Sequence, residues 1–221
     1  MIVKIPNIIK RLYPKRVWDG PATGKKIYLT FDDGPIPGVT PWVLEQLKQF
    51  NAKATFFCIG ENVEKNPGIF REVIAAGHMT GNHTYNHLNG WKTTGKRYLE
   101  NTLLAREIME RNSPRQELTT GENLDAHLVL FRPPYGKIRE SQARQLQKRG
   151  FRIVMWDIVS MDYNLNISPE RCYLNVRENA GSGSIIVFHD SQKARRNLEY
   201  ALPKSLEHFS KEGYSFERLE A

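Results

Sequence analysis

The 221-residue chain is poor in cysteine and has no long apolar run. Its two cysteines, Cys58 and Cys172, are too few for a disulfide framework, and their spacing fits no zinc–cysteine cluster. Cys58 lies within the apolar run ATFFCIG, so we expect a small buried hydrophobic residue there rather than a redox centre. No apolar run approaches the roughly 20 residues that a membrane-spanning helix needs, which argues against a transmembrane segment.

The chain also lacks a glycine-rich phosphate-binding loop and any dense block of basic residues. Its net charge is +8, from 32 Lys and Arg against 24 Asp and Glu. A basic surface favours an anionic partner such as nucleic acid or an anionic envelope polymer. Because no basic block and no recognition motif is present, we predict that nucleic acid is not the partner.

Residues 1–25 form a basic N-terminal extension, which we expect to pack on a single domain that comprises residues 1–221. Lys4 and Pro6 interrupt its apolar positions and no small-residue cleavage site follows, so it does not resemble a signal peptide. We therefore expect a location in the cytoplasm or at the inner face of the membrane. Several apolar residues share helical spacing, namely Ile5, Ile8, Ile9 and Leu12. They predict a short helix that closes one end of the domain, and a membrane-surface helix is the alternative.

Strand-like and helix-like segments alternate along the chain. Strands are predicted at residues 26–31, 53–60, 78–83, 127–132, 151–159 and 184–190. Helices are predicted at residues 40–50, 66–77, 96–111, 140–150, from 168 onward and at 197–210, with a surface loop at 112–126. Thr40 is expected to cap the helix at 40–50, with Pro41 at its first position. The alternation predicts an α/β fold, a distorted or incomplete (β/α) barrel, with an open doubly wound sheet as the alternative.

Chemically unusual residues follow the C-terminal ends of the predicted strands. They are Asp32 and Asp33, His83 and His87, Arg132 to Tyr135, Asp157 and Asp162, and His189 and Asp190. In a βα barrel this end of the strands carries the active site. The repeated coincidence therefore predicts an active site on that face.

The sequence HTYNH places His83 and His87 four residues apart. On a helix these residues share a face, so both imidazoles would reach one ion. A zinc-protease helix has Glu directly after the first histidine, whereas this chain has Thr84, which argues against that class. A carboxylate at a nearby strand end would complete a His₂–carboxylate site with an open position for water.

Asp32 and Asp33 place two like charges side by side at the end of a strand. One carboxylate could ligate a metal ion while the other accepts a proton from water, because the cation offsets their repulsion. An acidic turn is the alternative reading of Asp-Asp-Gly-Pro. Arg132 can hold a carboxylate bidentately, unless it forms a surface salt bridge. His189, paired with a carboxylate such as Asp162, could stay protonated near neutral pH, although lone strand-end histidines are usually structural.

Taken together, these residues resemble the polysaccharide deacetylases, the NodB-homology domain of carbohydrate esterase family four. Residues 30–35, TFDDGP, match the first motif of that family. Residues 83–87, HTYNH, match the second motif, and residues 131–136, FRPPYG, match the third. Residues 186–189, IVFH, are similar to the fifth. The ordered set extends from about Lys26 to Tyr214, nearly the whole chain.

The fourth motif departs from the family pattern Asp-x-x-Asp-Trp. Val159 replaces the first Asp, Asp162 stands at the second, and Tyr163 replaces the Trp. Asp157 lies nearby as an alternative carboxylate. In the fifth motif Ile186 and Phe188 replace leucines, and we expect the bulky Phe188 to narrow or reshape the acyl pocket.

The resemblance implies a metal-dependent hydrolase that removes N-acetyl groups from an amino sugar in a peptidoglycan- or chitin-like glycan. It assigns one divalent metal ion to Asp33, His83 and His87. Zinc is the first candidate, and cobalt, iron, manganese or nickel are alternatives because imidazole and carboxylate ligands accept each of them.

The resemblance also assigns the catalytic roles. Asp32 would be the base, and Arg132 would orient it. The metal and the backbone N–H of Tyr135 would stabilise the oxyanion, while His189 would protonate the departing amine. Asp162 is the expected partner of His189. An amide needs each of these functions, because it is a poor electrophile with a poor leaving group.

Three alternative functions are compatible with parts of the pattern: an O-acetyl esterase with the same metal site, an inactive glycan-binding domain, and a basic nucleic-acid-binding protein. The complete set of candidate ligands and catalytic residues argues against the inactive domain. The sequence leaves open which glycan is the substrate and which oligomer the chain forms.

Overall fold

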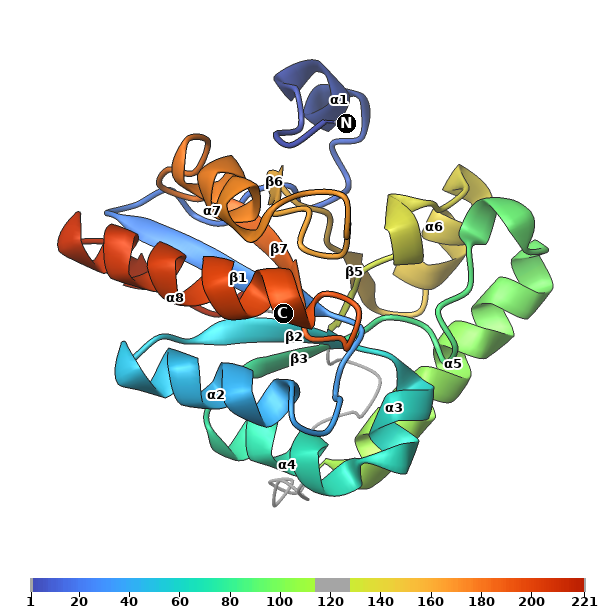
Figure 1. Ribbon diagram of the computed structural model, residues 1–221. Helices are drawn as coiled ribbons and strands as arrows, with labels where there is room; N and C mark the ends of the chain where they lie inside the picture. Colours follow the sequence, from blue (N-terminus) through green and yellow to red (C-terminus); the bar gives the residue numbers. More distant parts are fainter. Residues whose placement is uncertain (1, 114–127, 221) are drawn as a thin grey trace.

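A parallel β-sheet forms the centre of the molecule, and helices surround it (Figure 1). The computed structural model describes residues 2–113 and 128–220. The strands are β1 (Lys26–Asp32), β2 (Ala54–Cys58), β3 (Met79–Asn82), β4 (Val129–Phe131), β5 (Phe151–Ile153), β6 (Ile158–Val159), β7 (Ile185–His189) and β8 (Ser215–Phe216). The α-helices are α1 (Asn7–Leu12), α2 (Thr40–Gln49), α3 (Gly60–Lys65), α4 (Pro67–Ala75), α5 (Gly95–Asn112), α6 (Glu140–Gln147), α7 (Pro169–Arg177) and α8 (Arg195–Lys211). Short 3₁₀ helices lie at η1 (Gly90–Lys92) and η3 (Pro134–Gly136).

The strand order is β5-β4-β3-β2-β1-β7-β6, and β8 pairs with β1 beside this path. The strand pairs are parallel, as the alternation of strands and helices predicts. β5 and β6 follow one another in the chain but stand at opposite ends of the sheet. The predicted incomplete (β/α) barrel is therefore confirmed, and the open doubly wound sheet is not observed.

The strand predicted at residues 151–159 is two strands, so this prediction was wrong. Between them, Met155 donates its amide hydrogen to the carbonyl oxygen of Val17 (2.7 Å) and accepts a hydrogen bond from Arg132 (2.7 Å). The apolar run continues through the break because Val154 and Met155, which lie in it, are buried as well. Periodicity alone cannot reveal such a break.

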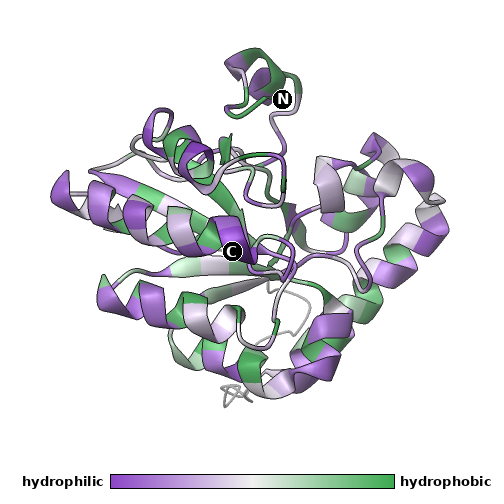
Figure 2. Ribbon diagram, in the orientation of Figure 1, coloured by the Kyte–Doolittle hydropathy of each residue, from purple (hydrophilic) through white to green (hydrophobic). Residues whose placement is uncertain are grey.

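Side chains alternate between the two faces of β1, as the geometry of a strand requires. Ile27, Leu29 and Phe31 belong to the main hydrophobic core, which also contains residues of α2, α4, α7 and α8. The ring of Phe31 stacks between those of Phe56 (4.9 Å) and Phe188 (6.1 Å). Hydrophilic residues mark the visible faces of α2 and α8, whereas hydrophobic residues mark the strands (Figure 2). Thr30 and Asp32 lie on the opposite face of β1, which faces the interior of the half-barrel.

Helix positions agree with the sequence prediction except in two places. Helix α3 was missed, because its six residues carry a single buried aliphatic side chain, Val63. Thr40 is not the cap of α2, since Val39 occupies that position. The hydroxyl of Thr40 instead donates to Asp190 (2.6 Å) and accepts from the amide of Ile36 (2.8 Å).

Cys58 is buried in the main core, as predicted. From residue 114 onward the predicted loop at 112–126 lies outside the described residues. Within the ranges that the structure describes, no helix is both long and apolar enough to cross a lipid bilayer.

Candidate active site

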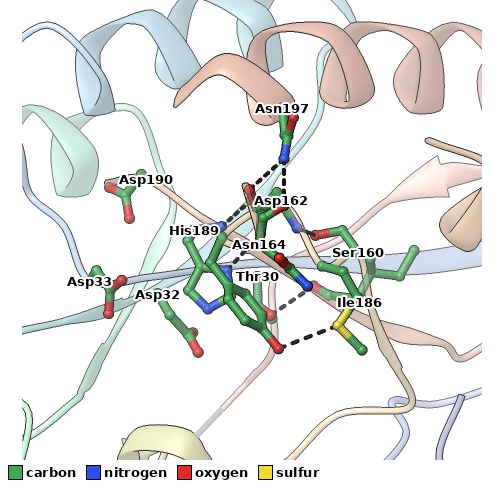
Figure 3. Close-up of polar contacts among 12 residues, drawn as sticks. Thr30, Asp32, Asp33, Ser160, Asp162, Asn164, Ile186, His189, Asp190 and Asn197 are labelled. Carbon is green, nitrogen blue, oxygen red and sulfur yellow. Dashed lines mark hydrogen bonds and ion pairs between the residues drawn. The ribbon is translucent and has the colours of Figure 1, made fainter. Parts of the chain in front are cut away.

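The predicted site residues meet at the C-terminal ends of the strands. Asp32 ends β1 and pairs in register with His189, which ends β7. His83 directly follows β3, and Arg132 directly follows β4. These strands lie within the run β4-β3-β2-β1-β7, so Asp32, His83 and His189 border one cavity of about 660 Å³ although they are distant in sequence. Figure 3 shows the part of this site around His189.

Asp33, His83 and His87 form a cluster with the geometry of a metal site. Their ligand atoms lie within 4.8 Å of one another. The Oδ1 atom of Asp33 is 3.4 Å from Nε2 of His87 and 3.9 Å from Nε2 of His83. Among the described residues, this buried Oδ1 atom has no hydrogen-bond partner. An orphaned carboxylate oxygen that faces two imidazole nitrogens fits a divalent cation.

Both imidazoles are oriented through their Nδ1 atoms. Nδ1 of His83 lies 2.8 Å from the carbonyl oxygen of Arg132, so it must carry the proton and donate it. Nδ1 of His87 lies 3.0 Å from the hydroxyl of Tyr135. This leaves Nε2 of each ring for a metal ion. Burial lowers the pKa of His83, and burial together with the repulsion that two protonated rings would have lowers the pKa of His87 to about 4. Both rings are therefore neutral at pH 7, the form that binds metals.

The two histidines converge for a different reason from the one predicted. Residues 83–87 form a turn rather than a helix, with Thr84 at φ 64° and His87 at φ 59°. Asn82 accepts a hydrogen bond from the amide of Thr84 (2.8 Å), and the hydroxyl of Thr84 accepts one from the amide of Leu88 (3.1 Å). These side-chain contacts hold the turn, and i, i+4 spacing alone could not distinguish it from a helix.

Arg132 is completely buried inside the half-barrel and points at Asp32. Its Nη1 atom donates to Asp32 (2.7 Å) and to Thr30 (2.7 Å), and its guanidinium lies 4.1 Å from the ring centre of Phe57. The predicted bidentate contact is wrong, because Nη2 binds the carbonyl oxygen of Met155 instead. Burial would raise the pKa of Asp32, but the charge and hydrogen bond of Arg132, together with the charge of His189, more than offset it, and its pKa is lowered. Asp32 is therefore ionised at neutral pH.

His189 is held by Asp162 from two directions. Nδ1 of His189 lies 2.8 Å from Oδ1 of Asp162, and its backbone amide donates to Oδ2 (2.7 Å) (Figure 3). Burial lowers the pKa of His189, but the charge and hydrogen bond of Asp162 raise it to a net value of about 9. The carbonyl oxygen of Asp162 accepts a hydrogen bond from Asn197 (2.9 Å). Asp157 lies elsewhere and contacts Lys10 (2.7 Å) and Ser184 (2.8 Å).

A tight turn presents Asp33, and it is held by Asp190 and by Asn62, a residue that the sequence did not single out. Asp33 has φ 86°, and its carbonyl oxygen accepts a hydrogen bond from Asn62 (2.7 Å). The amide of Gly34 donates to buried Asp190 (3.0 Å), and a Cβ on Gly34 would lie 1.9 Å from this carboxylate. Burial raises the pKa of Asp190 to about 8. Position 34 therefore has room only for glycine. The sequence DDGP contains this glycine but does not indicate that Asp190 is its neighbour.

The altered fifth motif does not act as predicted. Phe188 is completely buried in the main core and does not line the cavity. Because side chains alternate along β7, Val187 faces the cavity instead, where it lies beside Val159 and Met161. Tyr163 lies edge-on to His189, with 5.0 Å between ring centres. Tyr135 also lines the cavity and is 59% exposed, with a left-handed backbone at φ 59°.

Comparisons with known proteins agree with this geometry. Residues 19–154 match the family model described as polysaccharide deacetylase. The chain is 36% identical over 200 residues to a peptidoglycan-N-acetylglucosamine deacetylase of Bacillus cereus, which covers 90% of this chain and 88% of that protein. It is 30% identical over 217 residues to a deacetylase of the same description from Listeria monocytogenes, and covers 40% of that longer protein. The crystal structure of a peptidoglycan N-acetylglucosamine deacetylase superposes with a TM-score of 0.83 at 32% identity, covering 97% of this chain and 95% of the other.

Proposed function

The chain belongs to the polysaccharide deacetylase family, and from this membership we propose that it removes the N-acetyl group from N-acetylglucosamine residues of peptidoglycan. Its general activity, the hydrolysis of N-acetyl groups on a glycan, is that of its family and of its relatives. The observation that carries the proposal is the pairing of Asp32 with His189 beside the Asp33–His83–His87 cluster. A candidate base and a candidate acid thus border the same cavity as a candidate metal site.

The members of this family are metal-dependent, and the Asp33–His83–His87 cluster fits a divalent ion. We propose zinc as this ion, because two imidazoles and one carboxylate are a frequent ligand set of catalytic zinc. A bound cation would supply Lewis acidity to the reaction. Asp33 and the two histidines would hold it through the orphaned oxygen and the free Nε2 atoms.

The remaining residues supply the proton transfers. Asp32, ionised through Arg132, accepts a proton from the attacking water as that water adds to the acetyl carbon. His189, charged because Asp162 faces it, donates a proton to the amide nitrogen as the carbon–nitrogen bond breaks. Acetate and a free amine leave. The backbone N–H of Tyr135, in the rigid segment after Pro133 and Pro134, is our candidate donor to the oxyanion.

The Asp162–His189 pair also bears on whether the substrate is an acetyl amide or an acetyl ester. An ester leaves as an alcohol and needs less help from an acid than an amine does. A charged histidine with a dedicated carboxylate therefore favours the amide substrate. A His189→Ala variant that keeps full activity on acetyl esters would favour the esterase instead.

Acetate release from purified peptidoglycan tests the proposed function. We expect release that stops when a chelator removes the divalent ion and resumes when zinc is added. Acetylated xylan and a chitin-like oligomer, assayed in parallel, compare ester with amide and one glycan with another. Release from acetylated xylan alone would contradict the proposal.

The pH profile of kcat/KM tests the role of Asp162. In Asp162→Asn the alkaline limb should move to lower pH by about 1–3 units, because His189 loses the anion that raises its pKa. The sign follows from its role as an acid: activity needs protonated His189, so a lower pKa ends activity earlier. A bound cation would lower the pKa in both proteins, and the direction of the difference is unchanged.

Asp157→Asn is the control for this profile. Its carboxylate faces Lys10 and Ser184, so the limb should stay in place. A limb that moves with Asp157→Asn and not with Asp162→Asn would transfer the tuning role to Asp157.

A further inference from the structure

We propose that the N-terminal segment, residues 2–5, forms one wall of the glycan-binding groove, where Ile2 and Ile5 contact the apolar face of a sugar adjacent to the N-acetylglucosamine that is hydrolysed. This inference rests on the proposed function and names a subsite for it. Ile2 and Ile5 line the same cavity as Asp32, Asp33 and His189. The segment is thus part of the active-site cavity and not a remote extension.

The apolar part of the cavity is continuous across three segments of the chain. Ile2 and Ile5 come from the N-terminal segment, Trp156 from the link between β5 and β6, and Val159 and Met161 from β6 and the residues after it. Val159 and Met161 also pack together in one hydrophobic cluster. Ile2 nevertheless leaves 57% of its surface exposed. An exposed aliphatic side chain at the edge of a reaction cavity has apolar surface available for a ligand.

The backbone of the segment is fixed to β6. Lys4 forms an antiparallel bridge with Ile158. The amide of Ile5 donates to the carbonyl oxygen of Asp157 (2.8 Å), and the amide of Val159 donates to that of Val3 (3.0 Å). In Figure 1 the blue N-terminal segment lies above β6. These contacts fix the backbone of residues 3–5 before any substrate arrives, and Ile2 directly precedes this fixed stretch.

Asp157 reinforces this attachment with its buried carboxylate. Oδ1 contacts Nζ of Lys10 at 2.7 Å, and Oδ2 lies 3.7 Å from Nζ of Lys4 and 2.8 Å from the hydroxyl of Ser184. Nζ of Lys4 also donates to the carbonyl oxygen of Asn179 (2.7 Å). Burial lowers the pKa of Lys10, but its hydrogen bonds to Asp157 and Asp19 raise it overall, so Lys10 is charged. Asp157 is therefore a positioning residue for the segment.

The shape and chemistry of this wall fit a pyranose ring. Such a ring has an apolar face of C–H groups and a rim of hydroxyl groups. Ile2, Ile5 and Trp156 match the face, while Lys137 and Lys193, which line the same cavity, can donate to the rim. Because the metal cluster and His189 would surround the sugar that is hydrolysed, the apolar wall is available to the adjacent sugar of the glycan.

A matched pair of variants tests the wall. Ile2→Ala removes apolar surface inside the cavity, whereas Ile8→Ala makes the same substitution on α1 at a residue that is 68% exposed and does not line it. On a four-sugar N-acetylglucosamine oligomer, Ile2→Ala should raise KM roughly three- to tenfold with kcat unchanged. Ile8→Ala should match wild type. On the monosaccharide both variants should match wild type, because no neighbouring sugar is present.

Asp157→Asn gives a second, independent readout. Loosening the segment should raise KM for the four-sugar oligomer, as Ile2→Ala does. It should also speed the proteolytic removal of the N-terminal segment. Thermal unfolding of each variant shows whether the domain itself is intact. Release of the segment with KM unchanged, or equal effects of Ile2→Ala and Ile8→Ala, would overturn the inference. An effect of Ile2→Ala on the monosaccharide would overturn the assignment to a neighbouring sugar.

Binding separates this inference from the proposed function. If the wild type releases no acetate from any substrate, the proposed function fails. Calorimetric titration with the four-sugar oligomer then still tests the wall, since Ile2→Ala should raise Kd by the same factor as KM. No binding by the wild type, or equal Kd values for the two proteins, would contradict it.

Discussion

A His83→Ala, His87→Ala double variant should purify with almost no bound divalent metal and should lose nearly all deacetylation. The two Nε2 atoms are the imidazole nitrogens that would coordinate the ion, and one carboxylate oxygen of Asp33 alone cannot hold it. Metal stabilisation of charge in a transition state contributes several kcal/mol. A loss of about 10³-fold or more follows from that contribution. Elemental analysis of the purified proteins measures the metal, and acetate release measures the activity.

His208→Ala is the matched control for the double variant. It removes an imidazole from α8, outside the cluster, and should keep the metal content of the wild type. Thermal unfolding separates metal loss from misfolding, because His83 is buried and contributes a hydrogen bond to the carbonyl of Arg132. Equal metal content in the double variant and the wild type would place the ion elsewhere.

The sequence predicted the architecture well because the architecture depends on short-range patterns. Alternating apolar segments indicate parallel strands and crossover helices, and residues at strand ends indicate which edge carries the site. From this logic alone, Asp32, His83 and His189 could be expected on one face before any contact was known. The short helix α3 and the break between β5 and β6 carry no such pattern, and both were missed.

The predictions that failed depend on tertiary partners. Thr40 looks like a helix cap, but Asp190 takes its hydroxyl. Phe188 looks like a pocket residue because it precedes His189, yet strand alternation turns it into the core. The expected contact between Asp162 and His189 is observed, by contrast, and the alternative carboxylate, Asp157, binds Lys10 instead. Which side chains meet across the barrel is not encoded locally.

Asp32→Asn should lower kcat by about 10²- to 10⁴-fold, the usual contribution of a general base. The amide group is nearly isosteric but cannot take a proton from water. Its oxygen can still accept the hydrogen bond from Nη1 of Arg132, so the interior of the barrel should keep its arrangement. Removing the negative charge leaves Arg132 buried without a counter-charge, and a lower midpoint of thermal unfolding is therefore expected. Metal content should not change, because Asp32 is outside the Asp33–His83–His87 cluster.

Asp33→Asn separates the roles of the two adjacent carboxylates. It should lose metal affinity as well as activity, since it weakens the one carboxylate ligand, whereas Asp32→Asn should lose activity alone. The acid limb of the wild-type pH profile adds a further check. Because the pKa of Asp32 is lowered, Asp32 stays ionised when the pH falls into the ordinary carboxylate range, and base catalysis should fade only at a lower pH. If Asp32→Asn turned over at nearly the wild-type rate while Asp33→Asn also stayed active, neither carboxylate would have the role assigned to it. If Asp32→Asn instead lost its metal, the carboxylates would have exchanged roles, because the ion would then depend on the residue that Arg132 holds.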